Sequence, residues 1–378
     1  MQPPVIVGVG QTSYEVNTGG VSLQELIFEA ATLALEDAGL KRQDVDSIVI
    51  GSQDLIDGRG ISNMQNAGPA GAYLKDEIRV ANDGIYALLL AAMQIAAGRS
   101  RRALVISWAK CSETDIDAVS SAEFEPFCDR PVGLSGPIAL ALQANTLLGR
   151  NAGARRAASK LVMSSRAAGS RNPLVRANER VSIDDIESSP LASWPLHVLD
   201  LPPPRDGACA LVVAAADEGR SSKHPQVSVA GTGWGSEAYG IGARDFLEVP
   251  SLRRASARAT QRAGVVASDI DVVEFAAHSS FEHLIALQNM AFFHDGDTVA
   301  AILDGDAERI GRTALNPSGG TLASNPVAAV GLIRVAEVAL QLMGRAGAHQ
   351  VANARIGVAH GTSGQCLQSN GVVVLRRL

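Results

Sequence analysis

The chain has 378 residues, enough for a large buried core, and 46% of them are hydrophobic although only 4% are aromatic. Such a mixture, with 37 glycines, is typical of helices packed tightly against a largely buried sheet. The net charge of -6 gives no electrostatic reason to expect nucleic acid or an anionic membrane as a partner.

Several features place the chain among ordinary intracellular proteins. The beginning, "MQPPVIVGVGQT", lacks the charged region and long apolar segment of a signal peptide, and no apolar run approaches the roughly 18–20 residues of a membrane span. The four cysteines stand far apart without a CxxC pair, which argues against structural zinc and against a disulfide framework. We therefore expect a cytoplasmic protein without a metal site.

The first predicted element is a glycine-rich strand, "VIVGVG", at 5–10. Ser22 and Glu25 then form the S-x-x-E pattern of a capping box, which predicts an amphipathic helix running to Ala38. Farther along, "RVANDGIYALLLAAMQIAAGR" (79–99) reads as a strand end, a tight polar turn and an apolar helix that stops at Gly98. A turn between a strand and a helix is where many α/β enzymes place a nucleophile.

An internal repeat is the most informative feature of the sequence. Residues 34–50, "ALEDAGLKRQDVDSIVI", align without gaps on 259–275, "ATQRAGVVASDIDVVEF". Both copies read as a helix end with Ala-Gly, a short acidic turn and a buried strand, and both follow a glycine-rich strand. The repeat therefore predicts two βαβαββ-like halves with mixed sheets and helices on their faces.

The segment 109–205 has no counterpart in the second half and reads as a polar, loop-rich insertion of the kind that often covers a binding site. The predicted organisation is an N-terminal half of residues 1–108 plus 206–222, the inserted loop domain at 109–205, and a C-terminal half at 223–378.

These residues resemble the thiolase superfamily, in particular its lipid-transfer and acetyl-CoA acetyltransferase-like branch of sterol-carrier-type proteins. The resemblance covers nearly the whole chain and rests on the duplicated halves, "PFCDRPVG" (126–133), "SSPLASWPLHVLDLPPPRDGACALVV" (188–213), "EFAAHSSF" (274–281) and "NPSGGTLASNP" (316–326). It implies a five-layer αβαβα thiolase fold, a dimer, and thioester substrates that bring coenzyme A with them, with no other cofactor.

The family's usual chemistry needs a cysteine at the N-terminus of a buried helix, where its pKa is lowered so that the thiolate can take up an acyl group. Matching Gly84 and Ala87 to the family pattern places Ala81 at that position. Alanine cannot carry an acyl group, so ordinary thiolysis is not expected. Asp83 is interpreted first as a helix N-cap and, in the functional alternative, as a general base.

Two further positions carry the family's oxyanion-binding side chains. His278 follows a buried strand in "FAAHSSF", at the place of the family's catalytic histidine, and could donate to a thioester oxygen. Asn325 stands in "SNP" where thiolases carry Gly-His-Pro, which departs from the thiolase pattern and is closer to ketoacyl synthase III. An amide there can hold an oxyanion, and the alternative is a helix N-cap before Pro326.

The C-terminal loop, "AHGTSGQCLQSNG", offers either His360 or Cys366 at the place of the family's second catalytic cysteine. We favour His360, interpreted as the residue that ends a strand, and expect Cys366 to be a packed loop thiol near the substrate. Gly319 and Gly320 are expected to let the backbone approach the ligand. Cys111, Cys128 and Cys209 are expected to be buried small hydrophobes.

The leading hypothesis is an enzyme that acts on acyl-CoA thioesters without an acyl-cysteine, by retro-aldol or aldol chemistry on a β-hydroxyacyl-CoA in lipid or steroid side-chain metabolism. His278 and Asn325 would hold the oxyanion, and His360 or Asp83 would be the base. Aldolases of this branch work with a small OB-fold or zinc-ribbon partner chain. The alternatives are a non-catalytic acyl-CoA-binding subunit and an acetyl-CoA acyltransferase with another nucleophile, such as Cys366.

Overall fold

The computed structural model describes residues 2–61, 63–221, 223–290, 297–305 and 307–378. Within these ranges, eleven strands join in one mixed sheet and two short strands form a separate hairpin. The strands are β1 (Val5–Gln11), β2 (Ser47–Gly51), β3 (Asp76–Val80), β4 (Arg102–Lys110), β5 (Leu191–Ser193), β6 (Leu196–His197), β7 (Asp206–Ala214), β8 (Val227–Ser236), β9 (Val272–Phe275), β10 (Arg309–Ile310), β11 (Thr313–Leu315), β12 (Ile356–Ser363) and β13 (Ser369–Arg377).

The large sheet consists of two halves with the same strand order. The first half runs β3-β2-β4-β7-β1 and the second runs β11-β9-β12-β13-β8, with β10 added at its outer edge. In each half, three strands are parallel and the remaining two are antiparallel to their neighbours. The halves meet where β1 pairs with the start of β8, so the duplication predicted from the sequence is confirmed.

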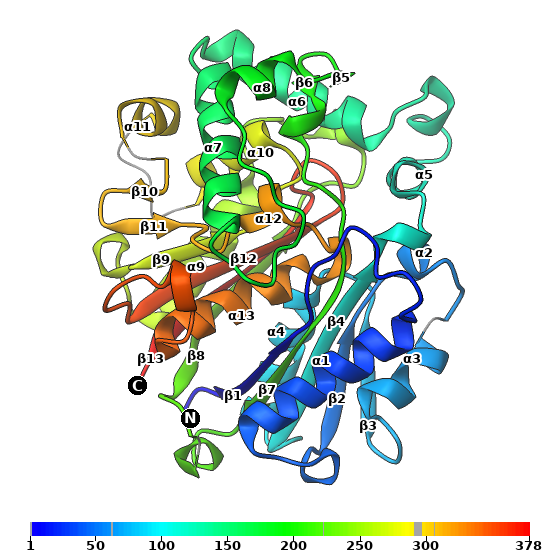
Figure 1. Ribbon diagram of the computed structural model, residues 1–378, viewed down its shortest axis with the longest axis vertical. Helices are drawn as coiled ribbons and strands as arrows, with labels where there is room; N and C mark the ends of the chain where they lie inside the picture. The colour runs from blue at the N-terminus through cyan, green and yellow to red at the C-terminus, as the bar shows by residue number, and fades with distance from the viewer. Residues whose placement is uncertain (1, 62, 222, 291–296, 306) are drawn as a thin grey trace.

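Helices divide the molecule into five layers, αβαβα (Figure 1). Helices α4 (Gly84–Ala96) and α13 (Val330–Met343) pack against each other between the two halves of the sheet. On the outer faces, α1 (Leu23–Ala38) covers β1, β7 and β4, while α9 (Pro250–Ala263) covers β8 and β13. The fold class predicted from the sequence is the one observed.

Close packing explains why both halves begin with a glycine-rich strand. A Cβ atom built on Gly8 of β1 would lie 2.2 Å from the carbonyl oxygen of Ala34 in α1. One on Gly231 of β8 would lie 2.0 Å from the carbonyl oxygen of Ala259 in α9. Only glycine allows the helices to approach the strands this closely.

The local signals of the repeat also have identical structures in the two halves. Helices α1 and α9 both end at a left-handed glycine, Gly39 with φ 67° and Gly264 with φ 62°, and a short 3-10 turn leads each chain into its buried strand. The capping box of Ser22 and Glu25 is present as predicted, and the helix after the polar turn ends before Gly98 in the left-handed region.

The segment 109–205 contains more helix than a loop-rich insertion would have. It contributes α5 (Ile116–Ala122), α6 (Gly136–Arg150), α7 (Ala154–Gly169) and α8 (Ile183–Ser188), which gather at the end of the molecule away from the chain termini (Figure 1). The remaining helices are α2 (Asp54–Asp57), α3 (Asn63–Ala70), α10 (Ser280–Asn289), α11 (Thr298–Asp304) and α12 (Gly320–Ala323).

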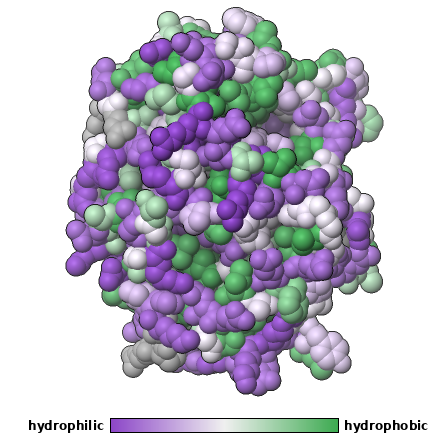
Figure 2. Space-filling view, viewed as in Figure 1, coloured by the Kyte–Doolittle hydropathy of each residue, from purple (hydrophilic) through white to green (hydrophobic). Residues whose placement is uncertain are grey.

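Among the described residues, no helix has the length and apolar character of a membrane span. On the face drawn in Figure 2, polar side chains are spread among apolar ones.

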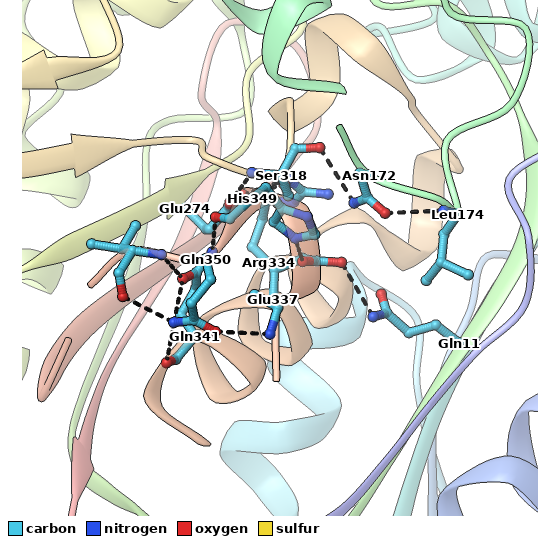
Figure 3. Close-up of polar contacts among 12 residues, drawn as sticks. Gln11, Asn172, Leu174, Glu274, Ser318, Arg334, Glu337, Gln341, His349 and Gln350 are labelled. Carbon is cyan, nitrogen blue, oxygen red and sulfur yellow. Dashed lines mark hydrogen bonds and ion pairs between the residues drawn. The ribbon is translucent and has the colours of Figure 1, made fainter. Parts of the chain in front are cut away.

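A network of charged side chains lies in the core beside α13 (Figure 3). Arg334 donates to the carboxylate of Glu274 (2.6 Å) and to the hydroxyl of Ser318 (2.7 Å), and that hydroxyl donates in turn to Glu274 (2.8 Å). One turn along the helix, Glu337 forms an ion pair with His349 at 3.0 Å. Each of the two carboxylates in this network therefore has a basic partner.

Candidate active site

A cavity of about 660 Å³ lies between the inserted helices and the loops at the ends of the sheet strands. Of the elements that line it, α2, α5, α6 and α7 are labelled in Figure 1. Its wall includes residues from α2, α5, α6 and α7, the loop at 198–204, the segment just before α13, and residues 362–365 at the end of β12. The side chains on this wall that carry ionisable, thiol, hydroxyl or amide groups include Cys111, Asp115, Asp117, Glu123, Arg166, His278, Asn325, Thr362 and Gln365. The inserted segment thus supplies a large part of the wall, as its length suggested.

His278 lies on the cavity wall, between β9 and the first turn of α10, and its side chain is 26% exposed. Its Nδ1 lies 3.1 Å from Oε2 of Glu282, a carboxylate with no solvent exposure. Burial by itself would lower the pKa of His278, but the charges of Glu282 and Glu123 outweigh burial and raise this pKa. The imidazole is therefore held in its protonated, hydrogen-bond-donating form over a wider pH range than a free histidine.

Glu123 is a second acidic group at this site, and the sequence analysis did not identify it. It lies just after α5, lines the cavity, and accepts a hydrogen bond of 2.8 Å from Nε2 of Gln365. Burial raises the pKa of Glu123, whereas the bond from Gln365 and the charge of His278 act in the opposite direction. No local motif marks this residue, because its position depends on how the inserted segment packs.

Asn325 lines the same cavity as His278. Its backbone pairs with the segment before β7, since its N–H donates to the carbonyl of Pro203 and its carbonyl accepts from the N–H of Arg205. The N-cap interpretation is wrong, because α13 begins only at Val330, after a 3-10 turn, and Ala329 is the capping position. The side-chain amide makes no hydrogen bond with another described residue, so it is available to a ligand.

Asp83 is the N-cap of α4, as the first interpretation of the turn predicted, and it does not line the cavity. Its carboxylate accepts a hydrogen bond from the N–H of Ile85 and another from the N–H of Gly331 at the start of α13, both at 2.8 Å. Burial raises its pKa to about 7, against the effect of these two bonds. Asp83 therefore joins the N-termini of the two central helices.

Ala81, which the family pattern predicts to stand at the nucleophile position, is exposed in the turn between β3 and α4. The neighbouring Asn82 accepts a hydrogen bond from Ser363, whose loop forms part of the cavity wall, so the turn lies beside the cavity.

His360 and Cys366 are both buried outside the cavity wall. Strand β12 continues past His360 to Ser363, contrary to the expectation that this histidine ends the strand, and the Nε2 of His360 lies 3.0 Å from Oδ1 of Asn370. Burial lowers the pKa of His360 to about 4 and raises the pKa of the Cys366 thiol far above its ordinary value.

Gly319 and Gly320 have positive φ angles of 101° and 60° and contact protein atoms rather than the cavity. A Cβ atom on Gly319 would lie 2.6 Å from the Cα of Gly169 in α7, so this glycine allows the helix to approach.

One thiol, that of Cys111, lies on the cavity wall among the described residues. Burial raises its pKa to about 11, so it is protonated near neutral pH. Cys209 is buried as expected, whereas Cys128 is exposed, contrary to the expectation. No cluster of three or more metal-ligating side chains occurs in the described part of the chain.

Comparison with known proteins agrees with this architecture. Residues 233–377 match the family model described as "Thiolase C-terminal domain-like". The chain is 28% identical to an acetyl-CoA acetyltransferase of Methanothermobacter thermautotrophicus, over 96% of this chain and 97% of the relative. The chain is therefore similar to proteins of the thiolase superfamily, as its sequence motifs predicted.

Two further relatives indicate the branch. The thiolase-like chain is 25% identical to the 17-hydroxy-3-oxo-4-pregnene-20-carboxyl-CoA lyase of Mycobacterium tuberculosis, covering 98% of each chain. A solved structure described as "Ltp2-ChsH2(DUF35) aldolase" superposes with a TM-score of 0.85 at 22% identity, covering 99% of this chain and 98% of that one. The predicted lipid-transfer and acetyl-CoA acetyltransferase-like branch is thereby supported.

Proposed function

We propose that this thiolase-like protein cleaves the bond between Cα and Cβ of a β-hydroxyacyl-CoA without forming an acyl-enzyme. The observation that carries the proposal is the composition of the cavity wall. It combines a protonatable histidine, an unbonded amide and a carboxylate of raised pKa with a thiol that burial keeps protonated. This set suits enolate chemistry and does not suit attack by a thiolate.

In the proposed reaction, a base removes the proton of the β-hydroxyl group. The oxygen electrons form a carbonyl at Cβ, the bond between Cα and Cβ breaks, and its electron pair moves to Cα as the enolate of the thioester. Protonation of Cα then gives an acyl-CoA shortened by the released aldehyde or ketone. No oxidant or other co-reactant is needed.

His278 and Asn325 hold the thioester oxygen while it carries negative charge. An imidazolium next to Glu282 and a neutral amide donate hydrogen bonds to the enolate oxygen more strongly than to the ground-state carbonyl, which lowers the barrier. The pKa of His278 is raised, so the protonated donor form persists to higher pH than in a free histidine.

We assign the base to Glu123, in place of His360 or Asp83. Glu123 lines the cavity, whereas the other two side chains are buried away from it and bonded to protein groups. Burial raises the pKa of Glu123 and so makes its carboxylate a stronger base than an exposed glutamate.

The relatives support the substrate class. One of them is named as a lyase of a steroid-derived carboxyl-CoA, and a structure of the same fold is described as an aldolase that includes a DUF35 chain. We propose accordingly that the substrate belongs to lipid or steroid side-chain metabolism and that a small partner chain of the DUF35 kind assists. A homodimer is proposed as well, with support from the unpaired outer edge of β3 and the exposed Tyr73 and Leu74 that precede it.

The test is an assay of the purified chain on β-hydroxyacyl-CoAs of several sizes, with and without a candidate DUF35 chain. Release of an aldehyde or ketone together with the shortened acyl-CoA supports the proposal. Binding of the thioesters without any cleavage, with the partner present, would overturn it and leave a non-catalytic acyl-CoA-binding subunit.

Acyl transfer is the second candidate, favoured by the relative named as an acetyl-CoA acetyltransferase. It requires a covalent acyl-enzyme on one of the cysteines. Incubation with acetyl-CoA followed by intact-mass measurement decides between the two: a stable gain of one acetyl group would establish acyl transfer, and an unchanged mass is what the lyase proposal expects.

A further inference from the structure

Arg166 has a position that the proposed reaction does not explain. It lies near the C-terminal end of α7, is part of the cavity wall, and is only 7% exposed. Its Nε is buried without a hydrogen-bond partner, and no ion pair among the described residues includes it. A guanidinium has five N–H donors and cannot lose its charge near neutral pH, so burying one without an acceptor is costly.

The surroundings of Arg166 make its charge less favourable still. Arg205, which is 6% exposed, donates to the carbonyls of Pro204 and Ala177 and forms no ion pair with another residue that the structure describes. Burial and, after it, the positive charge of Arg205 lower the pKa of Arg166 to about 10, and the charge of the exposed Glu179 acts in the opposite direction.

The acidic residues of the cavity do not neutralise this arginine. Glu123 accepts a hydrogen bond from Gln365, and its charge raises the pKa of His278. Asp115 and Asp117 are exposed. Asp115 is the N-cap of α5, and its carboxylate accepts a hydrogen bond from the N–H of Ala118. Arg166 is therefore the arginine of the described cavity wall, and its guanidinium forms no ion pair with another described residue.

We propose that Arg166, with Arg205 adding positive potential from behind, binds a carboxylate carried by the acyl group of the substrate. This assignment rests on the proposed function for the class of ligand, an acyl-CoA. A guanidinium receives a carboxylate through two parallel hydrogen bonds, and in a site closed to solvent such bonds replace those that the arginine lacks. The phosphates of coenzyme A share this anionic chemistry, so the experiment must separate the two sources.

The experiment measures binding by calorimetry for four probes: adipoyl-CoA, hexanoyl-CoA, coenzyme A and 3′-dephospho-CoA. We expect adipoyl-CoA to bind roughly 10- to 100-fold more tightly than hexanoyl-CoA, the range for charge-assisted hydrogen bonds. Arg166→Gln should remove this preference and leave hexanoyl-CoA binding unchanged. Arg156→Gln is the matched control, because Arg156 is an exposed arginine of the same helix; it should keep the preference.

Each other outcome overturns the assignment. Equal binding of adipoyl-CoA and hexanoyl-CoA excludes a carboxylate subsite, even if cleavage activity is found and the proposed function stands. Weaker binding of all four probes to Arg166→Gln would assign the arginine to coenzyme A. If no CoA thioester binds, the proposed function fails, and free adipate then tests the subsite alone: it should raise the thermal midpoint of the wild type but not of Arg166→Gln.

A second measurement separates binding from a structural role. Because the charge of Arg166 is uncompensated, Arg166→Met should leave the thermal midpoint unchanged or raise it, relative to Arg156→Met. A clear fall in the midpoint would show that the arginine supports the fold and would contradict the proposal.

Discussion

Two regions of this molecule bury positive charge, and they do so differently. In the core beside α13, Arg334 is 3% exposed and pairs with Glu274, and His349 pairs with Glu337 (Figure 3). In the cavity wall, Arg166 is nearly as buried but has no carboxylate partner in the described part of the chain. Charge that is matched within the protein supports the fold, whereas unmatched charge beside a cavity weakens the fold and is retained for a ligand.

The strongest way to test this difference is to break the matched pair. Arg334→Met removes the cation from Glu274, which has no solvent exposure, and should lower the free energy of unfolding by about 3–5 kcal/mol. The measurement is urea unfolding near pH 7. Arg345→Met is the control, because Arg345 pairs with Asp37 near the surface, and it should cost about 0–1 kcal/mol. Equal losses in the two variants would contradict the comparison.

The next largest effect is expected on catalysis. His278→Ala removes the charged donor to the enolate oxygen and should reduce the rate of β-hydroxyacyl-CoA cleavage by about 10²–10³-fold. The free energy of unfolding should also fall, because the buried carboxylate of Glu282 loses its basic partner, so the rate is measured at a temperature where the variant is fully folded. His224→Ala, which removes a histidine paired with Asp37 away from the cavity, serves as the control and should keep full activity. An unchanged cleavage rate in His278→Ala would refute the oxyanion assignment.

A smaller change tests Glu123 as the base. Gln365 donates to the carboxylate of Glu123 and so lowers its pKa, against the raising effect of burial. Gln365→Leu should therefore raise the pKa of Glu123 and move the acidic limb of the pH–rate profile to higher pH. Glu123→Gln should reduce the rate at every pH, by about 10²-fold, and abolish that limb. An acidic limb that persists in Glu123→Gln would mean that another group is the base.

The fold could be predicted from the sequence because its signals are local and occur twice. The Ala-Gly helix ends at Gly39 and Gly264, the glycine-rich strands and the capping box each depend on residues close in the chain. The turn at Asp83 was predicted for the same reason, since an N-cap contacts its own helix. What could not be seen was the second bond of Asp83, to Gly331, which joins elements 248 residues apart.

The candidate site was predicted only where a motif marks it. His278 and Asn325 line the cavity and stand in family-like motifs, whereas Glu123 and Arg166 come from the unrepeated segment 109–205. Their positions depend on the packing of α5 and α7 against distant elements, which the residues around them do not encode. His360 was placed near the ligand because β12 was expected to end there, and the strand is longer.

The smallest expected effect concerns His349, which pairs with Glu337 in the charged network beside α13. Burial would lower the pKa of His349, but Glu337 outweighs burial and raises it above its ordinary value of 6.5. Because the folded-state pKa is raised, the pair stabilises the fold fully below pH 6.5, and this contribution is lost as the pH rises through the folded-state pKa. His349→Gln, which keeps a donor without the charge, should therefore be less stable than the wild type by about 1 kcal/mol at pH 6 and by less at pH 9. Urea unfolding at the two pH values measures this difference. A difference that grows with pH would mean that His349 is neutral when folded, and that the charges of this network are matched only in the pair of Arg334 and Glu274.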